Sequence, residues 1–353
     1  MKTKTICTIG PKSSSKEVLS ALIRKKTDAL RINLSHTPPK QAIELIARMR
    51  SISKKIPIII DTQGKETRMM APFGKTITLK RGENISVTPF GSPVEKKSLW
   101  ITRPEFIQAI PRGKKIFIDD DRIVLKAITP TKNELPSLEC KVIKGGEMNV
   151  PKNIRLEKKL EPKTMLTETD RIVIKKALPY GIAEISLSYV STAKDVEEVR
   201  KFVGNRKIRL SSKIETRRAI DNLDSLISAS DSILIDRNDL GTEIGYQKIP
   251  FVQKFITKRC QREGKPIFVA THLLENMIHK DKPTRGEVND IINLVLDGVN
   301  GLILSSETAI GKNPVKILGA LKKIVAEGEL VMAMQQKNSS TDVIGRLNEL
   351  KYI

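Results

Sequence analysis

Aromatic residues and cysteine are scarce in this sequence of 353 residues, and long hydrophobic runs do not occur. Aromatic residues make up 4% of the chain, so platforms on which nucleic-acid bases could stack are few. Because no run of about 18 apolar residues exists, we expect no membrane-spanning helix. The first ten residues hold no long apolar stretch, so no signal peptide is expected. The three cysteines (Cys7, Cys140 and Cys260) show no metal-binding spacing, which fits a reducing, cytoplasmic location.

Negative charge is also in short supply, since 63 lysines and arginines face 40 acidic residues and the net charge is +23. The basic residues are spread along the whole chain and do not gather in one arm. Two interpretations compete: binding to an extended polyanion, or a general compositional bias together with a site for phosphorylated small molecules. The scarcity of aromatic residues and the absence of zinc-finger spacing argue against nucleic acid as a partner.

Apolar strand-like segments alternate with amphipathic segments over most of the chain. Strands are expected at 2–9, 29–34, 56–61, 182–188, 207–215, 232–236, 266–270 and 301–304. Helices are expected at 17–26, 38–55, 168–178, 193–203, 216–228, 251–263, 285–297 and 314–328. Eight apolar strands that alternate with helices predict an α/β fold, the (β/α)8 TIM barrel.

The alternation stops after the third expected strand. Short β-like runs separated by glycine and proline follow, at 76–79, 84–87, 115–118, 123–127 and 138–143. They predict a small inserted β-barrel domain, which leaves the TIM barrel at its catalytic end and is expected to act as a lid. The expected domains are 1–70 (barrel, first part), 71–155 (inserted lid), 156–330 (barrel, second part) and 331–353 (C-terminal tail).

Lys213 and Glu215 are two residues apart at the end of the fifth expected strand, so their side chains point to one face. On its own the pair is better read as a surface ion pair, since such pairs are common. Other strand ends are also polar, however, although buried parallel strands are usually apolar. Active sites of TIM barrels lie at these C-terminal strand ends. The polar residues at the expected ends are Arg31, Asn33, Ser35, Asp61, Lys213, Glu215, Asp239, Thr271 and Ser305.

Seven short blocks, in this order, carry a resemblance to a known family. They are residues 7–11 (CTIGP), 31–36 (RINLSH), 61–68 (DTQGKETR), 212–215 (SKIE), 239–241 (DLG), 282–285 (KPTR) and 304–308 (LSSET). The chain resembles the pyruvate kinase family over residues 3–329. The resemblance implies a TIM barrel with an inserted domain, and transfer of a phosphoryl group between phosphoenolpyruvate and ADP to give pyruvate and ATP.

The resemblance also implies a role for individual residues. Glu215 and Asp239 match the ligands of Mg²⁺ or Mn²⁺, and Lys213 and Arg31 match the residues that contact the moving phosphoryl group. Thr271 matches a residue of the substrate site and of the proton relay, with Ser305 and Glu307 nearby. The remaining implied sets are substrate binding (Asp236, Asn238, Asp239, Thr271, Ser305), K⁺ binding (Asn33, Ser35, Asp61, Thr62) and nucleotide binding (His36, Arg68, Asn33).

The sequence departs from the family pattern after the sixth expected strand. Asp236-Arg237-Asn238-Asp239 replaces the usual Ala-Arg-Gly-Asp. Three readings of Asp236 are open: a like-charge contact that weakens substrate binding, an extra metal ligand, or a carboxylate that turns aside to pair with Arg237 or a nearby lysine.

Further departures concern other parts of the site. Gln63 and Lys65 replace Lys and Pro, beside Glu66, which accompanies K⁺ dependence in the family. Ser306 replaces a glycine, which would add strain if a positive φ were required. The segment 145–149 is too short for the family's lysine-bearing loop, for which Lys144 is a poor substitute.

Three functions compete on this evidence: an active pyruvate kinase, a divergent paralogue, and a non-catalytic binding protein. The paralogue would act on another enol phosphate or 2-oxo acid, as a phosphotransferase or a metal-dependent lyase. The family's C-terminal domain has no counterpart in the sequence, so a homodimer or monomer without that domain's allosteric control is expected.

Overall fold

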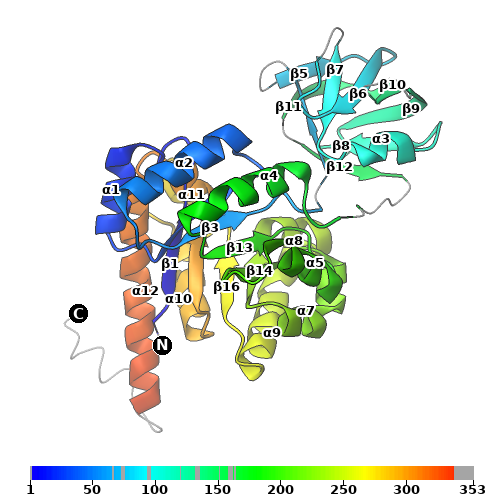
Figure 1. The fold of residues 1–353 in the computed structure, drawn as a ribbon. Coiled ribbons are helices and arrows are strands. Elements are labelled where there is room, and N and C mark those ends of the chain that lie inside the picture. Colours follow the sequence, from blue (N-terminus) through cyan, green and yellow to red (C-terminus); the bar gives the residue numbers. More distant parts are fainter. Residues whose placement is uncertain are drawn as a thin grey trace. The chain divides into compact units, whose positions relative to one another are not determined.

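The computed structural model describes residues 2–65, 67–72, 76–93, 97–119, 121–131, 136–150, 152–157, 162 and 164–337. The chain forms two compact units (Figure 1). The first unit is Met1–Gly64 together with Glu168–Ile353, and the second is Lys65–Thr167. The second unit is therefore an insertion in the sequence of the first.

In the described residues of the first unit, eight parallel strands close into a barrel in the order β1-β17-β16-β15-β14-β13-β3-β2. The strands are β1 (Lys4–Thr8), β2 (Ala29–Asn33), β3 (Ile58–Asp61), β13 (Glu184–Leu187), β14 (Arg209–Ile214), β15 (Ser232–Asp236), β16 (Ile267–Ala270) and β17 (Gly301–Leu304). This confirms the α/β TIM-barrel fold expected from the alternating sequence pattern.

The inside of the barrel is filled by apolar side chains from several strands, including Ile59, Leu234, Phe268 and Ile303. Gly301 makes room for one of them, because a Cβ at this position would lie 2.7 Å from the ring of Phe268. A filled barrel has no pore, so the chemistry of the fold is left to the strand ends and the loops that follow them.

Helices surround the barrel strands. They are α1 (Lys16–Arg24), α2 (Pro39–Ile52), α4 (Glu168–Ala177), α5 (Ala193–Val203), α6 (Arg217–Asp221), α7 (Leu223–Ala229), α8 (Arg237–Ile244), α9 (Ile249–Arg262), α10 (Arg285–Leu296), α11 (Ser306–Ala309) and α12 (Pro314–Lys337). Among the described residues, none of the helices is both long enough and apolar enough to cross a membrane.

Two helix predictions need correction, and two short helices of the first unit were not predicted. The helix expected at 216–228 is two helices, α6 and α7, which meet at Asn222. The short helices α8 and α11 were not expected, because their sequences show little apolar periodicity. Helix α12 ends at Lys337, whereas the sequence predicted an end at 328. It packs beside α10 (Figure 1). The rest of the expected C-terminal tail, residues 338–353, lies outside the described residues.

The second unit is a small β-barrel, as the sequence predicted. Its strands are β4 (Arg68–Met70), β5 (Thr76–Leu79), β6 (Asn84–Pro89), β7 (Ser98–Ile101), β8 (Lys115–Ile118), β9 (Ile123–Thr131), β10 (Ser137–Lys144), β11 (Gly146–Asn149) and β12 (Lys152–Leu156), with helix α3 (Glu105–Ala109). The barrel order is β10-β6-β7-β4-β12-β8-β9, and β11 pairs with β5. The sequence did not predict β4, β7, β11 and β12, which have three to five residues each.

Candidate active site

Charged side chains lie buried at the C-terminal ends of the barrel strands. Arg31 on β2, Asp61 on β3, Lys213 on β14 and Asp236 on β15 are each no more than 4% exposed. Since the strands are parallel, these ends meet at one rim of the barrel. A buried charge is costly unless it is paired, so the four residues have to be understood through their contacts.

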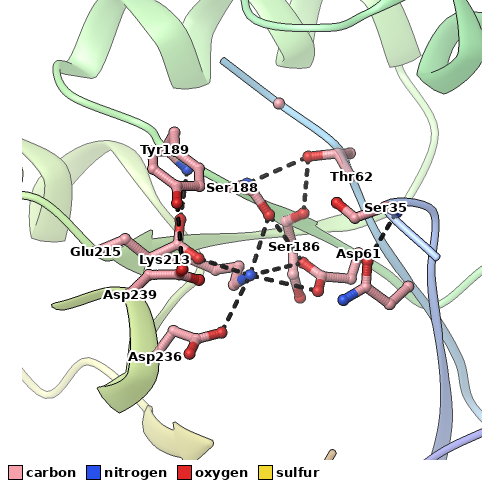
Figure 2. A network of polar contacts seen from close by, with 12 residues as sticks. Ser35, Asp61, Thr62, Ser186, Ser188, Tyr189, Lys213, Glu215, Asp236 and Asp239 are labelled. Carbon is pink, nitrogen blue, oxygen red and sulfur yellow. Dashed lines mark hydrogen bonds and ion pairs between the residues drawn. The ribbon is translucent and has the colours of Figure 1, made fainter. Parts of the chain in front are cut away.

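The Lys213 ammonium is the centre of this network. Figure 2 shows it between the carboxylates of Glu215, Asp236 and Asp61. Lys213 Nζ lies 2.8 Å from Glu215 Oε1, 3.3 Å from Asp236 Oδ2 and 3.3 Å from Asp61 Oδ1. It also donates a hydrogen bond of 3.0 Å to Ser188 Oγ. Burial alone would lower the pKa of Lys213, but the three carboxylates raise it well above its usual value, so the side chain is fully charged.

Arg31 joins the network through Asp61. Its guanidinium forms an ion pair with Asp61 Oδ2, and it donates hydrogen bonds to Thr8 Oγ1 at 2.8 Å and to Ser305 Oγ at 3.4 Å. Asp61 is fully buried and lies between two cationic side chains. Arg31 and Lys213, which are 182 positions apart in the numbering, are thus held by the same carboxylate.

The loop after β13 supplies contacts that the sequence analysis did not single out. Tyr189 has a φ of 56°, which is uncommon for a residue other than glycine. Its backbone N–H donates to Glu215 Oε2 at 2.5 Å, and its hydroxyl donates to Asp239 Oδ1 at 3.2 Å. Ser188 receives a hydrogen bond from Lys213 and donates to Asp61 Oδ1 at 3.3 Å. A sequence signal for them exists, because Ser188 and Tyr189 lie at the end of an expected strand, like the polar residues that the sequence analysis named as site candidates.

Glu215, Asp236 and Asp239 gather into a carboxylate cluster beside Lys213. One oxygen from each lies within 4.8 Å of one oxygen from the others. Burial raises the pKa of Glu215 well above its usual value; Lys213 lowers it, and the charges of Asp239 and Asp236 raise it again. A divalent cation with a preference for oxygen ligands would relieve this repulsion, so the residues present fit Mg²⁺ or Mn²⁺.

Asp236 is the residue on which the sequence left three readings open. It does not pair with Arg237, which forms an ion pair of 2.6 Å with Asp290 on α10. It contacts Lys213 and also belongs to the carboxylate cluster. Burial by itself raises the pKa of Asp236, but Lys213 and Arg31 outweigh burial and lower it, so the carboxylate is ionised.

Thr271 and His272 follow β16 with left-handed backbones, at φ values of 69° and 52°. Arg237 holds both, since its guanidinium donates to the carbonyl oxygen of Thr271 at 2.8 Å and to that of His272 at 2.6 Å. Such strain persists only where the surroundings impose it, and it often marks functional sites. Thr271 Oγ1 accepts a hydrogen bond from the backbone of Asn238 at 3.0 Å. His272, which the sequence analysis missed, lies 3.3 Å from Asn238 Oδ1 through Nε2.

Glu307 supports this loop from the end of β17. Its carboxylate accepts hydrogen bonds from the backbone N–H groups of Leu273, at 3.0 Å, and of Ser305, at 2.7 Å. The neighbouring Ser306, one of the described residues, has no positive φ, so the strain considered for this substitution does not arise. The serine is accommodated as the first residue of α11.

The predicted K⁺ and nucleotide residues near β2 and β3 are partly joined to the network. Asn33 is paired with Asp61 in the parallel register, and its side chain accepts a hydrogen bond of 2.8 Å from Ser35 N. Thr62 Oγ1 accepts from Ser188 N at 3.2 Å. His36 is an exposed residue of the turn that follows, where its N–H donates to Asn33 O at 3.3 Å. Its role as a nucleotide contact stays a prediction.

Other predicted residues have structural contacts of their own. Arg68 lies in β4 of the second unit, where its N–H donates to Thr102 Oγ1 at 2.9 Å. Lys144 Nζ donates to the carbonyl of Asp121 at 2.9 Å, and residues 146–149 form β11. Gln63 donates from its side chain to Leu34 O at 3.1 Å. Glu66 lies outside the described residues.

Comparisons with known proteins agree with this geometry. The family model described as "Pyruvate kinase, barrel domain" matches residues 1–318. A pyruvate kinase of Methylorubrum extorquens is 32% identical over 332 residues, which cover 93% of this chain and 69% of that protein. A pyruvate kinase of Encephalitozoon cuniculi is 34% identical over 331 residues, which cover 93% of this chain and 76% of that protein.

A solved structure gives the same result. The crystal structure of Cryptosporidium parvum pyruvate kinase aligns with a TM-score of 0.80 at 31% sequence identity, over 93% of this chain and 70% of that one. Fold, strand-end chemistry and sequence thus point to one conclusion: the chain belongs to the pyruvate kinase family, and it is an enzyme of the pyruvate kinase type.

Proposed function

We propose that the protein transfers a phosphoryl group between phosphoenolpyruvate and ADP, giving pyruvate and ATP, with the help of a divalent cation. One observation carries the proposal: the buried Lys213 ammonium, 2.8 Å from Glu215, at the edge of a carboxylate cluster. Phosphoryl transfer needs mainly positioning and neutralisation of charge, and a fixed ammonium beside a cation site offers both. Membership of the pyruvate kinase family supports the choice of substrates.

Glu215 and Asp239 would hold Mg²⁺ or Mn²⁺. When bound, the cation supplies Lewis-acid neutralisation of phosphate oxygens. Tyr189 orients both ligands, because its backbone N–H contacts Glu215 and its hydroxyl contacts Asp239. Groups that orient ligands in this way usually affect affinity as well. The protein's own contribution to the cation site is therefore a pair of fixed carboxylates.

Lys213 and Arg31 would act on the transferred phosphoryl group. Both are held by Asp61, so their separation is fixed before the substrate arrives. Preorganised cationic groups stabilise charge that spreads over the phosphoryl oxygens in the transition state, and they need little reorganisation during the reaction. Neither side chain has to leave water during catalysis, since both are already buried.

Thr271 would serve the second half of the reaction, in which the enol of pyruvate is protonated on carbon. Its hydroxyl proton has two acceptors, Asp236 Oδ1 at 3.2 Å and Ala270 O at 2.5 Å. The backbone N–H of Asn238 donates a hydrogen bond to Thr271 Oγ1. A hydroxyl held between a donor and acceptors can pass a proton onward, and we assign it that task. Asn238, Asp239, Asp236 and Ser305 complete the proposed substrate site.

The remaining roles are assigned by the same proposal. Asn33, Ser35, Asp61 and Thr62 would bind K⁺ through oxygen atoms at the ends of β2 and β3. His36, Arg68 and Asn33 would contact the nucleotide. Each of these assignments has to be tested with its own variant, because the contacts described above would be the same whether or not these residues bind K⁺ or the nucleotide.

One observation favours a second candidate, action on a different enol phosphate or 2-oxo acid. Asp236 adds an ionised carboxylate to a site proposed to bind an anion, and a like charge disfavours binding. A less negatively charged substrate would tolerate it better. Thermal unfolding with Mg²⁺ and a set of 2-oxo acids and enol phosphates separates the two candidates, because the preferred substrate raises the melting temperature most.

The direct test of the first candidate is a coupled assay for pyruvate formed from phosphoenolpyruvate and ADP with Mg²⁺, with and without K⁺. Turnover that requires ADP and the cation is expected. If no pyruvate forms while another enol phosphate stabilises the fold, the second candidate replaces the first.

A further inference from the structure

Asp236 stands at the N-cap position of α8 but does not cap the helix. An aspartate there normally accepts a hydrogen bond from one of the first backbone N–H groups of the helix. Asp236 makes no such bond. The N–H of Asn238, the second helical residue, instead donates to Thr271 Oγ1 at 3.0 Å. The usual structural task of Asp236 is thus carried out by another residue, and its carboxylate is turned into the barrel end.

The Asp236 carboxylate retains capacity to bind a cation. Its Oδ2 lies 3.3 Å from Lys213 Nζ, and its Oδ1 lies 3.2 Å from Thr271 Oγ1. An ionised carboxylate offers about four lone-pair positions, and these two contacts use half of them. The side chain is 6% exposed, and it has an oxygen within 4.8 Å of oxygens of Glu215 and Asp239.

A count of charges shows what Asp236 changes. The network of ion pairs and clustered carboxylates consists of Arg31, Asp61, Lys213, Glu215, Asp236 and Asp239. With the cation bound and all four carboxylates ionised, the four carboxylates and two cationic side chains carry a net charge of −2, which the divalent cation neutralises. Without Asp236, the same network with the cation would carry +1. An incoming phosphate or carboxylate therefore meets a neutral site here and would meet a positive one if Asp236 were an uncharged residue.

We propose that Asp236 is a third carboxylate for the divalent cation, and that it strengthens binding of the cation while weakening binding of the small anionic substrate. The proposal rests on the proposed function, because it takes the substrate to be phosphoenolpyruvate or an anion like it. One neighbouring charge commonly changes an ionic equilibrium by about 10-fold or more. We therefore expect opposite changes of about 10-fold in the two affinities when the charge of Asp236 is removed.

The test is Asp236→Asn, which keeps the size of the side chain and its contact with Thr271. The dissociation constant of Mn²⁺ is measured by electron paramagnetic resonance on the full chain without substrate. That of phosphoenolpyruvate is measured by calorimetry with saturating Mn²⁺. The expected results are a dissociation constant about 10-fold higher for Mn²⁺ and a dissociation constant about 10-fold lower for phosphoenolpyruvate. Asp236→Ala is a second variant, in which no oxygen remains to contact the cation.

Two controls separate this effect from damage to the fold. Asp224→Asn removes an exposed carboxylate that pairs with Arg259, and it should change neither affinity. Asp239→Asn removes a proposed cation ligand, and it should weaken both. A purely structural role of Asp236 would also weaken both affinities, so changes of opposite sign are the signature of the proposal. Thermal unfolding shows that each variant is folded.

The outcomes are distinguishable from failure of the proposed function. Unchanged Mn²⁺ affinity in both Asp236 variants would overturn the inference, even if the wild type turns over phosphoenolpyruvate. Weaker binding of both ligands would overturn it too. If Mn²⁺ binding falls but neither wild type nor variant binds phosphoenolpyruvate, the proposed function and the substrate half of the inference are both contradicted.

Discussion

Lys213, in β14, and Glu215, the first residue after that strand, are both buried, and Lys213 Nζ lies 2.8 Å from Glu215 Oε1. On a solvent-exposed strand such a pair would contribute little to stability. Here it joins the side chain that we propose contacts the phosphoryl group to a proposed cation ligand, so the two groups are held next to each other. The consequences of this arrangement can be measured.

Replacing Lys213 with methionine should lower kcat for pyruvate formation by about 100-fold to 1000-fold, because a preorganised charge in the transition state is lost. It should also lower the free energy of unfolding, by about 3–5 kcal/mol, since three buried carboxylates lose their shared partner. Steady-state kinetics and urea unfolding without cation give the two values. If the variant has the same kcat as the wild type, Lys213 takes no part in phosphoryl transfer. Added Mn²⁺ should recover part of the stability but not the rate.

Thr271→Val should slow protonation of the enol by about 100-fold, because the hydroxyl is lost while the shape of the side chain is kept. The readout is exchange of the methyl protons of pyruvate with D₂O in the presence of ATP and Mg²⁺. The affinity for Mn²⁺ should not change, since Thr271 is not a member of the carboxylate cluster. Exchange at the wild-type rate would show that the hydroxyl takes no part in proton transfer.

Glu184, at the start of β13, should make stability depend on pH. Burial raises the pKa of Glu184 above its usual value of 4.5, although Arg209, 3.1 Å away, and Lys4 lower it. The folded state therefore holds this proton more tightly than the unfolded state. The resulting stabilisation is complete below about pH 4.5 and is lost as the pH rises through the raised pKa of the folded state.

In a Glu184→Gln variant this contribution is absent. The free energy of unfolding of the variant, minus that of the wild type, should therefore increase as the pH rises, by about 1.4 kcal/mol for each pH unit within that window. Urea unfolding of both proteins between pH 4 and pH 8 measures the difference. A difference that does not vary with pH would contradict the account of Glu184.

Replacing K⁺ with a bulky organic cation should lower the rate of pyruvate formation, because we propose that K⁺ is bound by oxygen atoms of Asn33, Ser35, Asp61 and Thr62. Asn33→Ala should shift the K⁺ concentration for half-maximal rate upward by about 10-fold, the effect typical of losing one group in a polar site. A rate independent of K⁺ would contradict this assignment.

The sequence predicted the barrel and the charged strand ends, because both follow from local patterns. Strands such as Ile58–Asp61 are apolar up to a final charged residue, and in a parallel barrel those final residues must share one rim. The strands β4 and β11 could not be predicted in the same way, since three or four residues are too few to show alternation.

The parts of the site that the sequence could not predict depend on backbone conformation and on partners far away in the chain. Tyr189 reaches Glu215 only through its left-handed backbone, for which a tyrosine carries no sequence signal. Arg237 could have paired with its neighbour Asp236 and instead pairs with Asp290, 53 residues further along. That choice left Asp236 to Lys213, a pairing with a nearby lysine that was one of the open readings. The other two readings, a cation ligand and a like-charge contact with the substrate, stay predictions.

Transfer of labelled phosphate measures the central claim most directly. Phosphoenolpyruvate labelled at phosphorus is mixed with ADP, Mg²⁺ and K⁺, and the label in ATP is followed for the wild type and the Lys213→Met variant side by side. The account predicts steady labelling of ATP by the wild type, with a loss of about 100-fold or more in the variant. Labelling at the same rate in both proteins, or no labelling by a wild type that binds phosphoenolpyruvate and Mg²⁺, would contradict it.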